Sequence, residues 1–147
     1  MSQGTGTKGA REKVYTAIAA SDKVRELATG GINPIDGNLP LEEALTRGPQ
    51  IIYYNESYDH PGFRRYTHTI SIDCLVPTGE YRLDGDVVGS FEYAEALHDA
   101  VVDSLESRQH GSGSAMDIFT ARFSLDPSYN LWQILVRVNS ILPPQKD

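Results

Sequence analysis

The stretch from Arg65 to Val76 constrains the fold of this chain more than any other. Apolar and polar side chains alternate along it, and β-branched and aromatic types are frequent. The apolar side of the pattern comprises Tyr66, His68, Ile70, Ile72, Cys74 and Val76, and Leu75 alone interrupts the polar side. Alternation of this length is typical of a strand with one buried face. Such a strand needs neighbouring strands and an apolar layer over that face.

The length and composition indicate one folded domain. The chain has 147 residues, of which 39% are hydrophobic and 22% are charged, which is enough for a sizeable core. The formal net charge is 13 minus 20, or −7, so we expect no general binding to phosphate backbones. The sequence shows no signal peptide and no apolar run of about 20 residues, so we expect a chain kept in the cytoplasm. The single cysteine, Cys74, is expected to be an inert buried hydrophobe.

The first half of the chain predicts a helix followed by a hairpin. Residues 1–9 are expected to form a flexible arm, because their G-x-G-x-x-G lacks the preceding strand that a dinucleotide site needs. An amphipathic helix is predicted over residues 10–28, ended by Gly30-Gly31, with apolar positions at Val14, Ala17, Ile18, Val24, Leu27 and Ala28. A long connection follows, in which residues 41–45 could form a helical turn or two. A strand over residues 50–55 and a turn at residues 59–62 then lead into the Arg65–Val76 strand.

The second half predicts another helix and another hairpin. Residues 78–89 could be a β-extension or an ordered loop. A helix is predicted over residues 90–107, with Ser90 as its N-cap and an apolar stripe of Phe91, Ala94, Leu97, His98, Val101, Val102 and Leu105. Strands over residues 115–125 and 131–142 follow, with inward sets of Phe119, Ala121, Phe123 and Leu125, and of Trp132, Ile134, Val136 and Val138.

These elements predict an α+β fold in the order α-β-β-α-β-β. Two hairpins would form a four-stranded, largely antiparallel sheet, with two helices packed on one face. The single domain would span residues 10–142, and residues 143–147 would be a flexible tail.

Motifs for catalysis, metal binding or cofactor binding are absent from the sequence. The four histidines share no metal-ligand spacing, and there is no G-x-S-x-G or Walker loop. Asp99 and Asp103 lie four residues apart on the polar face of the second predicted helix, where a solvated surface is the expected role. We therefore expect no enzyme activity, no cofactor and no bound metal.

Taken together, these segments resemble the phage tail-terminator (tail-completion) family of the lambda type. Residues 14–27 resemble its first helix, which runs into an Ile-x-Pro, here Ile32–Pro34. Residues 49–53 are similar to its Pro-x-Ile-x-Tyr-type first strand, residues 65–75 to its alternating central strand, and residues 92–105 to its second helix. The final hairpin agrees in type and order.

The resemblance implies an α/β sandwich-like protomer that assembles into a ring, typically a hexamer, at the virion tail–neck junction. Its partners would be the tail tube protein and the neck or head-completion proteins, and DNA would pass through the lumen without specific binding. Each contact in a ring is heterologous, so every chain needs two distinct patches. We predict these patches in residues 35–48 and 77–89, with contacts at Leu41, Glu42, Glu43, Arg47, Tyr81, Arg82, Leu83 and Asp84.

Two alternatives remain open from the sequence. The chain could instead be a head–tail neck (head-completion) protein. It could also be a small enzyme or ligand-binding domain, which would need a deep pocket holding an acid or base with a strongly shifted pKa.

Overall fold

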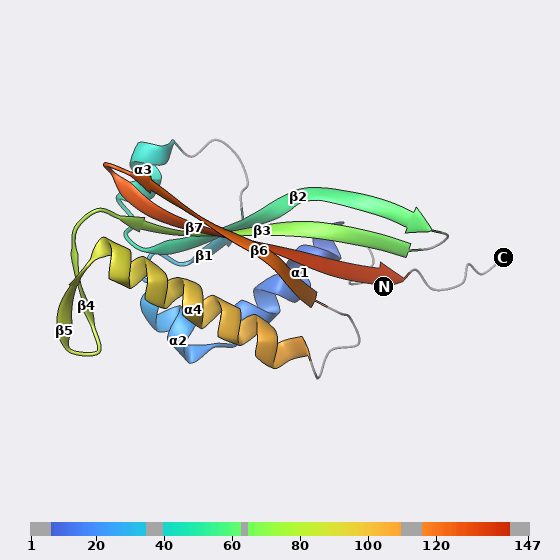
Figure 1. The fold of residues 1–147 in the computed structure, drawn as a ribbon, viewed down its shortest axis with the longest axis horizontal. Helices are drawn as coiled ribbons and strands as arrows, with labels where there is room; N and C mark the ends of the chain where they lie inside the picture. Colours follow the sequence, from blue (N-terminus) through green and yellow to red (C-terminus); the bar gives the residue numbers. More distant parts are fainter. Residues whose placement is uncertain (1–6, 35–39, 63–64, 110–115, 142–147) are drawn as a thin grey trace.

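The computed structural model describes residues 7–34, 40–62, 65–109 and 116–141. They form an α+β fold with a mostly antiparallel five-stranded sheet and a separate two-stranded sheet (Figure 1). The elements in chain order are α1 (Thr7–Ala19), α2 (Asp22–Leu27), β1 (Ile32–Pro34), α3 (Leu41–Leu45), β2 (Gln50–Gly62), β3 (Arg65–Pro77), β4 (Glu80–Leu83), β5 (Asp86–Gly89), α4 (Ser90–Gln109), β6 (Met116–Asp126) and β7 (Tyr129–Ile141). The predicted class is confirmed, but the predicted four-stranded sheet and the six-element order are wrong in detail.

Both predicted hairpins form, and they merge into one sheet. Strand β2 pairs antiparallel with β3, and β6 pairs antiparallel with β7. Strand β3 joins the two hairpins because it also pairs antiparallel with β7, from Arg65 opposite Ile141 to Pro77 opposite Tyr129. The strand order is therefore β1-β2-β3-β7-β6, with the strongly alternating strand at its centre.

The fifth strand of the sheet, β1, was not predicted from the sequence. It pairs parallel with β2 over three residues, from Ile32 opposite Ile51 to Pro34 opposite Tyr53. Three residues are too few for a period-2 pattern to be visible. The chain approaches β2 closely just before β1, because the Gly30 N–H donates to the Pro49 carbonyl oxygen at 2.7 Å. A Cβ at Gly30 would lie 2.8 Å from the carbonyl oxygen of Arg47, so this approach requires glycine.

The segment between β3 and α4 forms a β-hairpin. Of the two alternatives for residues 78–89, a β-extension or an ordered loop, the structure therefore shows the β-extension. Strands β4 and β5 pair antiparallel, from Glu80 opposite Gly89 to Leu83 opposite Asp86. The two residues between the strands both have positive φ, 50° at Asp84 and 90° at Gly85. A two-residue turn of this kind matches the twist of paired strands and favours Asp-Gly.

Irregularities in the strand pairing explain two incorrect predictions. Strand β2 continues past Asn55 to Gly62, and its pairing with β3 shifts between Asn55 and Ser57 and again between Asp59 and Gly62. The turn predicted at residues 59–62 therefore belongs to the strand, and the connection at residues 63–64 lies outside the described residues. Such bulges let a strand absorb extra residues and continue.

A bulge in β6 likewise overturns the predicted inward position of Phe119. The pairing of β6 with β7 shifts between Ile118 and Thr120. The shift removes Phe119 from the inward set, and the Arg137 guanidinium carbon lies 4.1 Å from the centroid of its exposed ring. Ala121, Phe123 and Leu125 keep the predicted register, because they pair with Ile134, Trp132 and Asn130.

Three helices cover one face of the sheet, while α3 lies against the other face at one end (Figure 1). The helix predicted over residues 10–28 is two helices, because the Ser21 hydroxyl accepts a hydrogen bond from the Val24 N–H at 3.2 Å and starts α2. Helix α1 begins at Thr7, inside the segment predicted to be an arm. The predicted apolar positions of both helices are nevertheless buried.

The core lies between these helices and the sheet. Ile70, Ile72, Cys74 and Val76 from β3 are fully buried, together with Ile134, Val136 and Val138 from β7. Helix α4 contributes Ala94, Leu97, Val101 and Leu105 from its predicted stripe. Burial of this apolar surface is the main stabilising contribution to the fold.

Candidate assembly surfaces

Residues 35–39 of the first predicted contact segment lie outside the described residues. Its remaining part, residues 40–48, and the second segment, residues 77–89, lie at the same end of the molecule but on opposite sides of the sheet (Figure 1). Helix α3 carries Leu41, Glu42 and Glu43, which are exposed, as is Arg47 just after it. The Gln50 side-chain amide donates to the Ala44 carbonyl oxygen and so fixes α3 to the start of β2. The exposed side chains of α3 are therefore presented on a fixed element.

The β4–β5 hairpin turns part of the second predicted segment inward. Tyr81 and Leu83 are half-buried against the core, and the Tyr81 ring lies 4.8 Å from the Tyr93 ring between centroids. The Tyr81 hydroxyl also donates to the Pro77 carbonyl oxygen at 2.6 Å. Arg82 and Asp84 point away from the core and are exposed. The structure thus separates the four predicted residues into two inward and two outward side chains.

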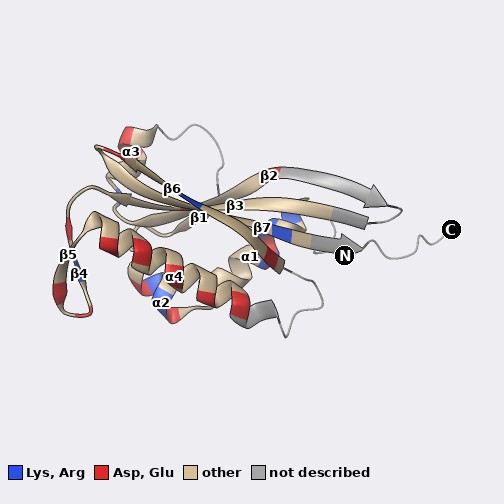
Figure 2. Ribbon diagram, in the orientation of Figure 1, with Lys and Arg blue, Asp and Glu red and all other residues tan. Residues whose placement is uncertain are grey.

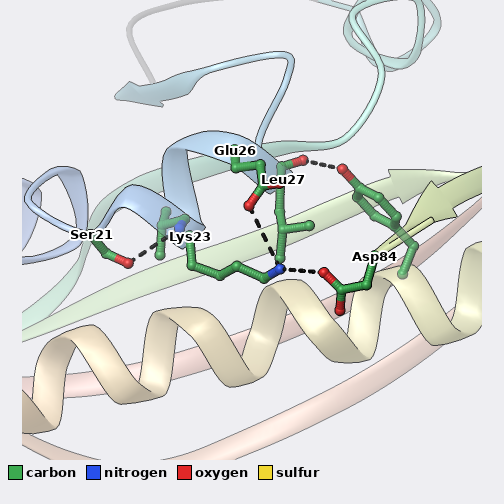
Figure 3. A network of polar contacts seen from close by, with 7 residues as sticks. Ser21, Lys23, Glu26, Leu27 and Asp84 are labelled. Atoms are coloured by element: carbon green, nitrogen blue, oxygen red, sulfur yellow. Dashed lines mark hydrogen bonds and ion pairs between the residues drawn. The ribbon is translucent and has the colours of Figure 1, made fainter.

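An ion pair connects the tip of this hairpin to α2. Lys23 Nζ lies 3.0 Å from Asp84 Oδ1 and 3.6 Å from a Glu26 carboxylate oxygen (Figure 3). Both side chains of the Lys23–Asp84 pair are substantially exposed, so water screens much of the attraction. The pair orients the hairpin more than it stabilises the fold.

The sheet face opposite the main helices carries a polar network at its centre. Asp73 Oδ1 accepts a hydrogen bond from the Ser71 hydroxyl at 2.9 Å, and Asp73 Oδ2 accepts one from the Tyr54 hydroxyl at 3.3 Å. The Gln133 amide donates to the Ser71 oxygen at 3.0 Å and to the Tyr54 oxygen at 3.3 Å. Three adjacent strands therefore contribute to one polar cluster. The alternation in the sequence placed Ser71 and Asp73 on the polar side of β3, but it did not show that they contact side chains of β2 and β7.

The Asp73 carboxyl is the titratable group of this cluster. Burial raises its pKa, and hydrogen bonds from Ser71 and Tyr54 oppose the shift in part. The folded state therefore holds the proton more tightly than the unfolded state, so the ionisation costs stability. That cost appears as the pH rises above the ordinary value of 3.8 and through the folded-state pKa.

We expect the Asp73→Asn variant to lose this pH dependence. Its free energy of unfolding relative to that of the unsubstituted chain should increase as the pH rises from about 4 towards neutrality. Urea unfolding at a series of pH values measures the difference. Asp73→Ala is the companion variant, because it removes the titration together with the hydrogen bonds and should show the same trend from a lower baseline. A difference that does not change with pH would contradict the assigned direction.

A second surface that the sequence did not reveal lies between α4 and β6. Phe91, at the start of α4, is 48% exposed, and Leu125, near the end of β6, is 74% exposed. The Phe91 and Phe123 rings meet edge to face with 5.3 Å between centroids, and Phe123 lies 5.1 Å from Trp132. We call this group of Phe91, Phe123, Leu125 and Trp132 the α4–β6 corner. Its residues were all predicted to face the core, and they do face that side, but the helix layer covers them incompletely.

Acidic side chains follow the outer face of α4 beside this corner. The sequence from Ser90 to Glu106 contains no Lys or Arg, and its acidic residues are all exposed: Glu92, Glu95, Asp99, Asp103 and Glu106 (Figure 2). The Asp99 carboxylate lies 2.9 Å from Nδ1 of His98, whose ring packs on Trp132 with 4.5 Å between centroids. The surface of α4 is therefore negative next to an apolar corner.

The described residues offer little for chemistry. Within them, no group of three or more His, Cys, Asp or Glu side chains could hold a metal ion. Cys74 is fully buried, and burial raises the pKa of its thiol, so the reactive thiolate is disfavoured. None of the described helices is both long enough and apolar enough to span a bilayer.

Comparison with known proteins adds no relative to this picture. No protein-family model matches the chain, and no curated protein matches it in sequence.

Proposed function

We propose that this chain is a structural virion protein, a tail terminator whose copies form a ring that caps the phage tail tube. The ring ends tube polymerisation and joins the tube to the neck at the tail–neck junction. The proposal rests on the resemblance of the helix, hairpin, helix and hairpin segments to that family. It assigns the chain a role in assembly and no catalytic role.

The observation that supports this role best is an open sheet with two unlike edges. One edge is formed by the short strand β1 and the other by the eleven-residue strand β6. A surface on the β1 side differs from any surface on the β6 side, so side-by-side copies in one orientation meet through heterologous contacts. Such contacts build a closed ring when the rotation between copies closes.

The charge of the chain agrees with a lumen that conducts DNA. The formal net charge of −7 disfavours adhesion of a phosphate backbone to the ring. In this proposal the tail tube protein and the neck proteins are the specific partners, and DNA passes without specific binding.

Imaging of labelled particles tests the proposal directly. The chain carrying a small gold-binding tag should mark the head-proximal end of the tail tube in purified virions, and the purified chain should form rings on isolated tubes in negative stain. A label above the neck would place the chain among the head-completion proteins instead. A monomer that binds no tube end would refute the proposed function.

A further inference from the structure

The helix layer covers the outer strand β6 only in part. Helix α4 packs on β3 and β7 and also contacts β6, where Met116 at the start of the strand is buried but Leu125 near its end is not. Leu125 is 74% exposed, and exposed Phe91 lies beside it across Phe123. Adjacent exposed large apolar side chains on a folded protomer are typical of a contact surface for another protein.

The surface of α1, on the opposite side of the helix layer, carries basic and aromatic side chains that complement the acidic and apolar surface at α4 and β6. Helix α1 packs on β2 and β3, near the β1 edge of the sheet. Lys8, Arg11 and Tyr15 follow one face of α1 at spacings of three and four residues. The Tyr15 ring is 42% exposed and lies 5.7 Å from the Tyr53 ring of β2, while the Arg11 guanidinium donates to the Asn55 side chain. We call Lys8, Arg11 and Tyr15 the α1 edge.

The two surfaces match in polarity and in sign. On the α1 edge, Lys8 and Arg11 outnumber Glu12, which lies 3.9 Å from Lys8, so the edge has a net positive charge of 2 minus 1, or +1, whereas the charged residues of α4 are all acidic as far as Glu106. Each surface also has exposed aromatic or aliphatic side chains at its centre. Complementary charge around an apolar centre steers association and fixes the orientation of the partners.

We propose that the α4–β6 corner of one copy binds the α1 edge of a second copy of this chain. This inference rests on the proposed ring and names the contact that would close it. A second copy is the occupant because the chain itself provides the complementary surface on the other side of its own sheet. The contact is heterologous, so an open row of copies keeps one unused corner at one end and one unused edge at the other until the ring closes.

Two variants, each disabling one half of the contact, test the proposal. The corner variant combines Glu95→Gln with Leu125→Gln, and the edge variant combines Lys8→Gln with Tyr15→Gln. All four side chains are exposed, so both variants should fold, which circular dichroism and thermal unfolding check. Leu41→Gln distinguishes this contact from the α3 contact predicted from the sequence, because Leu41 is 49% exposed on α3, on the other side of the sheet.

Light scattering and sedimentation of the purified full chain give the readout. We expect the unsubstituted chain to self-associate with rising concentration, and more weakly at high salt. Each variant alone should be monomeric, with the apparent dissociation constant raised by about tenfold or more. An equimolar mixture of the two should form a one-to-one dimer and nothing larger, because only one competent contact remains. Leu41→Gln should assemble as the unsubstituted chain does.

The other outcomes overturn the inference in distinguishable ways. If the unsubstituted chain assembles but the mixture stays monomeric, or if either variant alone still assembles, the contact lies elsewhere and the proposed ring stands. Loss of assembly in Leu41→Gln would move the contact to α3. A corner variant that assembles normally but fails to cap isolated tail tubes would assign the corner to the tube protein. A chain that stays monomeric at every concentration, even with tubes present, refutes both the contact and the proposed function.

Discussion

Replacing Leu97 with alanine is expected to lower the free energy of unfolding by about 2–5 kcal/mol. Leu97 is fully buried on the face of α4 that packs against the sheet, so its removal leaves a cavity between the helix layer and β3 and β7. The cost combines the lost transfer free energy of the side chain with the lost packing around the cavity. Equilibrium unfolding in urea measures it.

Leu125→Ala is the matched control for this prediction, because it makes the same chemical change at a position that is 74% exposed. Its effect should stay within about 0.5 kcal/mol when measured at concentrations at which the chain is monomeric. Equal effects at the two positions would mean that α4 does not pack on the sheet as described.

Replacing Tyr93 with phenylalanine is expected to lower the free energy of unfolding by about 0.5–1.5 kcal/mol. The Tyr93 hydroxyl donates to the Leu27 carbonyl oxygen at 2.6 Å in the buried region between α4 and the end of α2 (Figure 3). Phenylalanine keeps the ring and its packing on Tyr81 but leaves that carbonyl without this donor. The Leu27 carbonyl keeps one partner, because it also accepts a hydrogen bond from the Thr29 N–H at 3.0 Å, so the variant loses one buried hydrogen bond without leaving the acceptor unsatisfied.

The neighbouring ion pair gives the contrast for Tyr93→Phe. Asp84→Asn removes the charge that pairs with Lys23, and asparagine tolerates the positive φ of 50° at this turn position. Because both partners are exposed and water screens their attraction, the loss should be smaller than that caused by Tyr93→Phe. Thermal unfolding of both variants ranks the buried hydrogen bond against the exposed ion pair, and a larger loss in Asp84→Asn would reverse the ranking.

The central strand was predictable because burial on one face leaves a period-2 signal over many residues. Ile70 and Ile72 are fully buried as that pattern requires. The apolar spacing likewise identified which side of each helix faces the sheet. The break between α1 and α2 was missed because the spacing continues across it, although Ser21 followed by Asp22 is a common helix start. The spacing of apolar residues indicates which way the side chains point, but it does not show whether the helix is continuous.

Local signals also existed for the hairpin between β3 and α4. Asp84-Gly85 flanked by alternating side chains is a strong two-residue turn signal, and with it the β-extension would have been the better-supported alternative. Strand β1 had no such signal, because its three residues become a strand through pairing with β2.

The candidate surfaces were less predictable than the fold. Periodicity placed Phe123 and Leu125 towards the core side, which is their direction in the structure. It could not show that the helix layer covers β6 only in part and leaves Leu125 exposed, because the area that a helix layer covers depends on tertiary packing. The prediction for Phe119 failed for a related reason. The bulge between Ile118 and Thr120 changes the phase of the alternation, so the phase that turns Ala121 inward does not extend back to Phe119.

The uninterrupted pairing of β3 with β7 has a consequence for how the protein reaches its native state. The paired positions, such as Thr67 and Asn139, are far apart along the chain. Bringing them together costs conformational entropy, so we expect the pairing of β3 with β7 to form slowly. During synthesis, the apolar face of β3 can pack early against the apolar face of α4. The pairing of β3 with β7 forms only after β7 has emerged from the ribosome. Until then one flank of β3 stays open to pairing with other chains, and a chaperone that shields it would raise the yield of native protein.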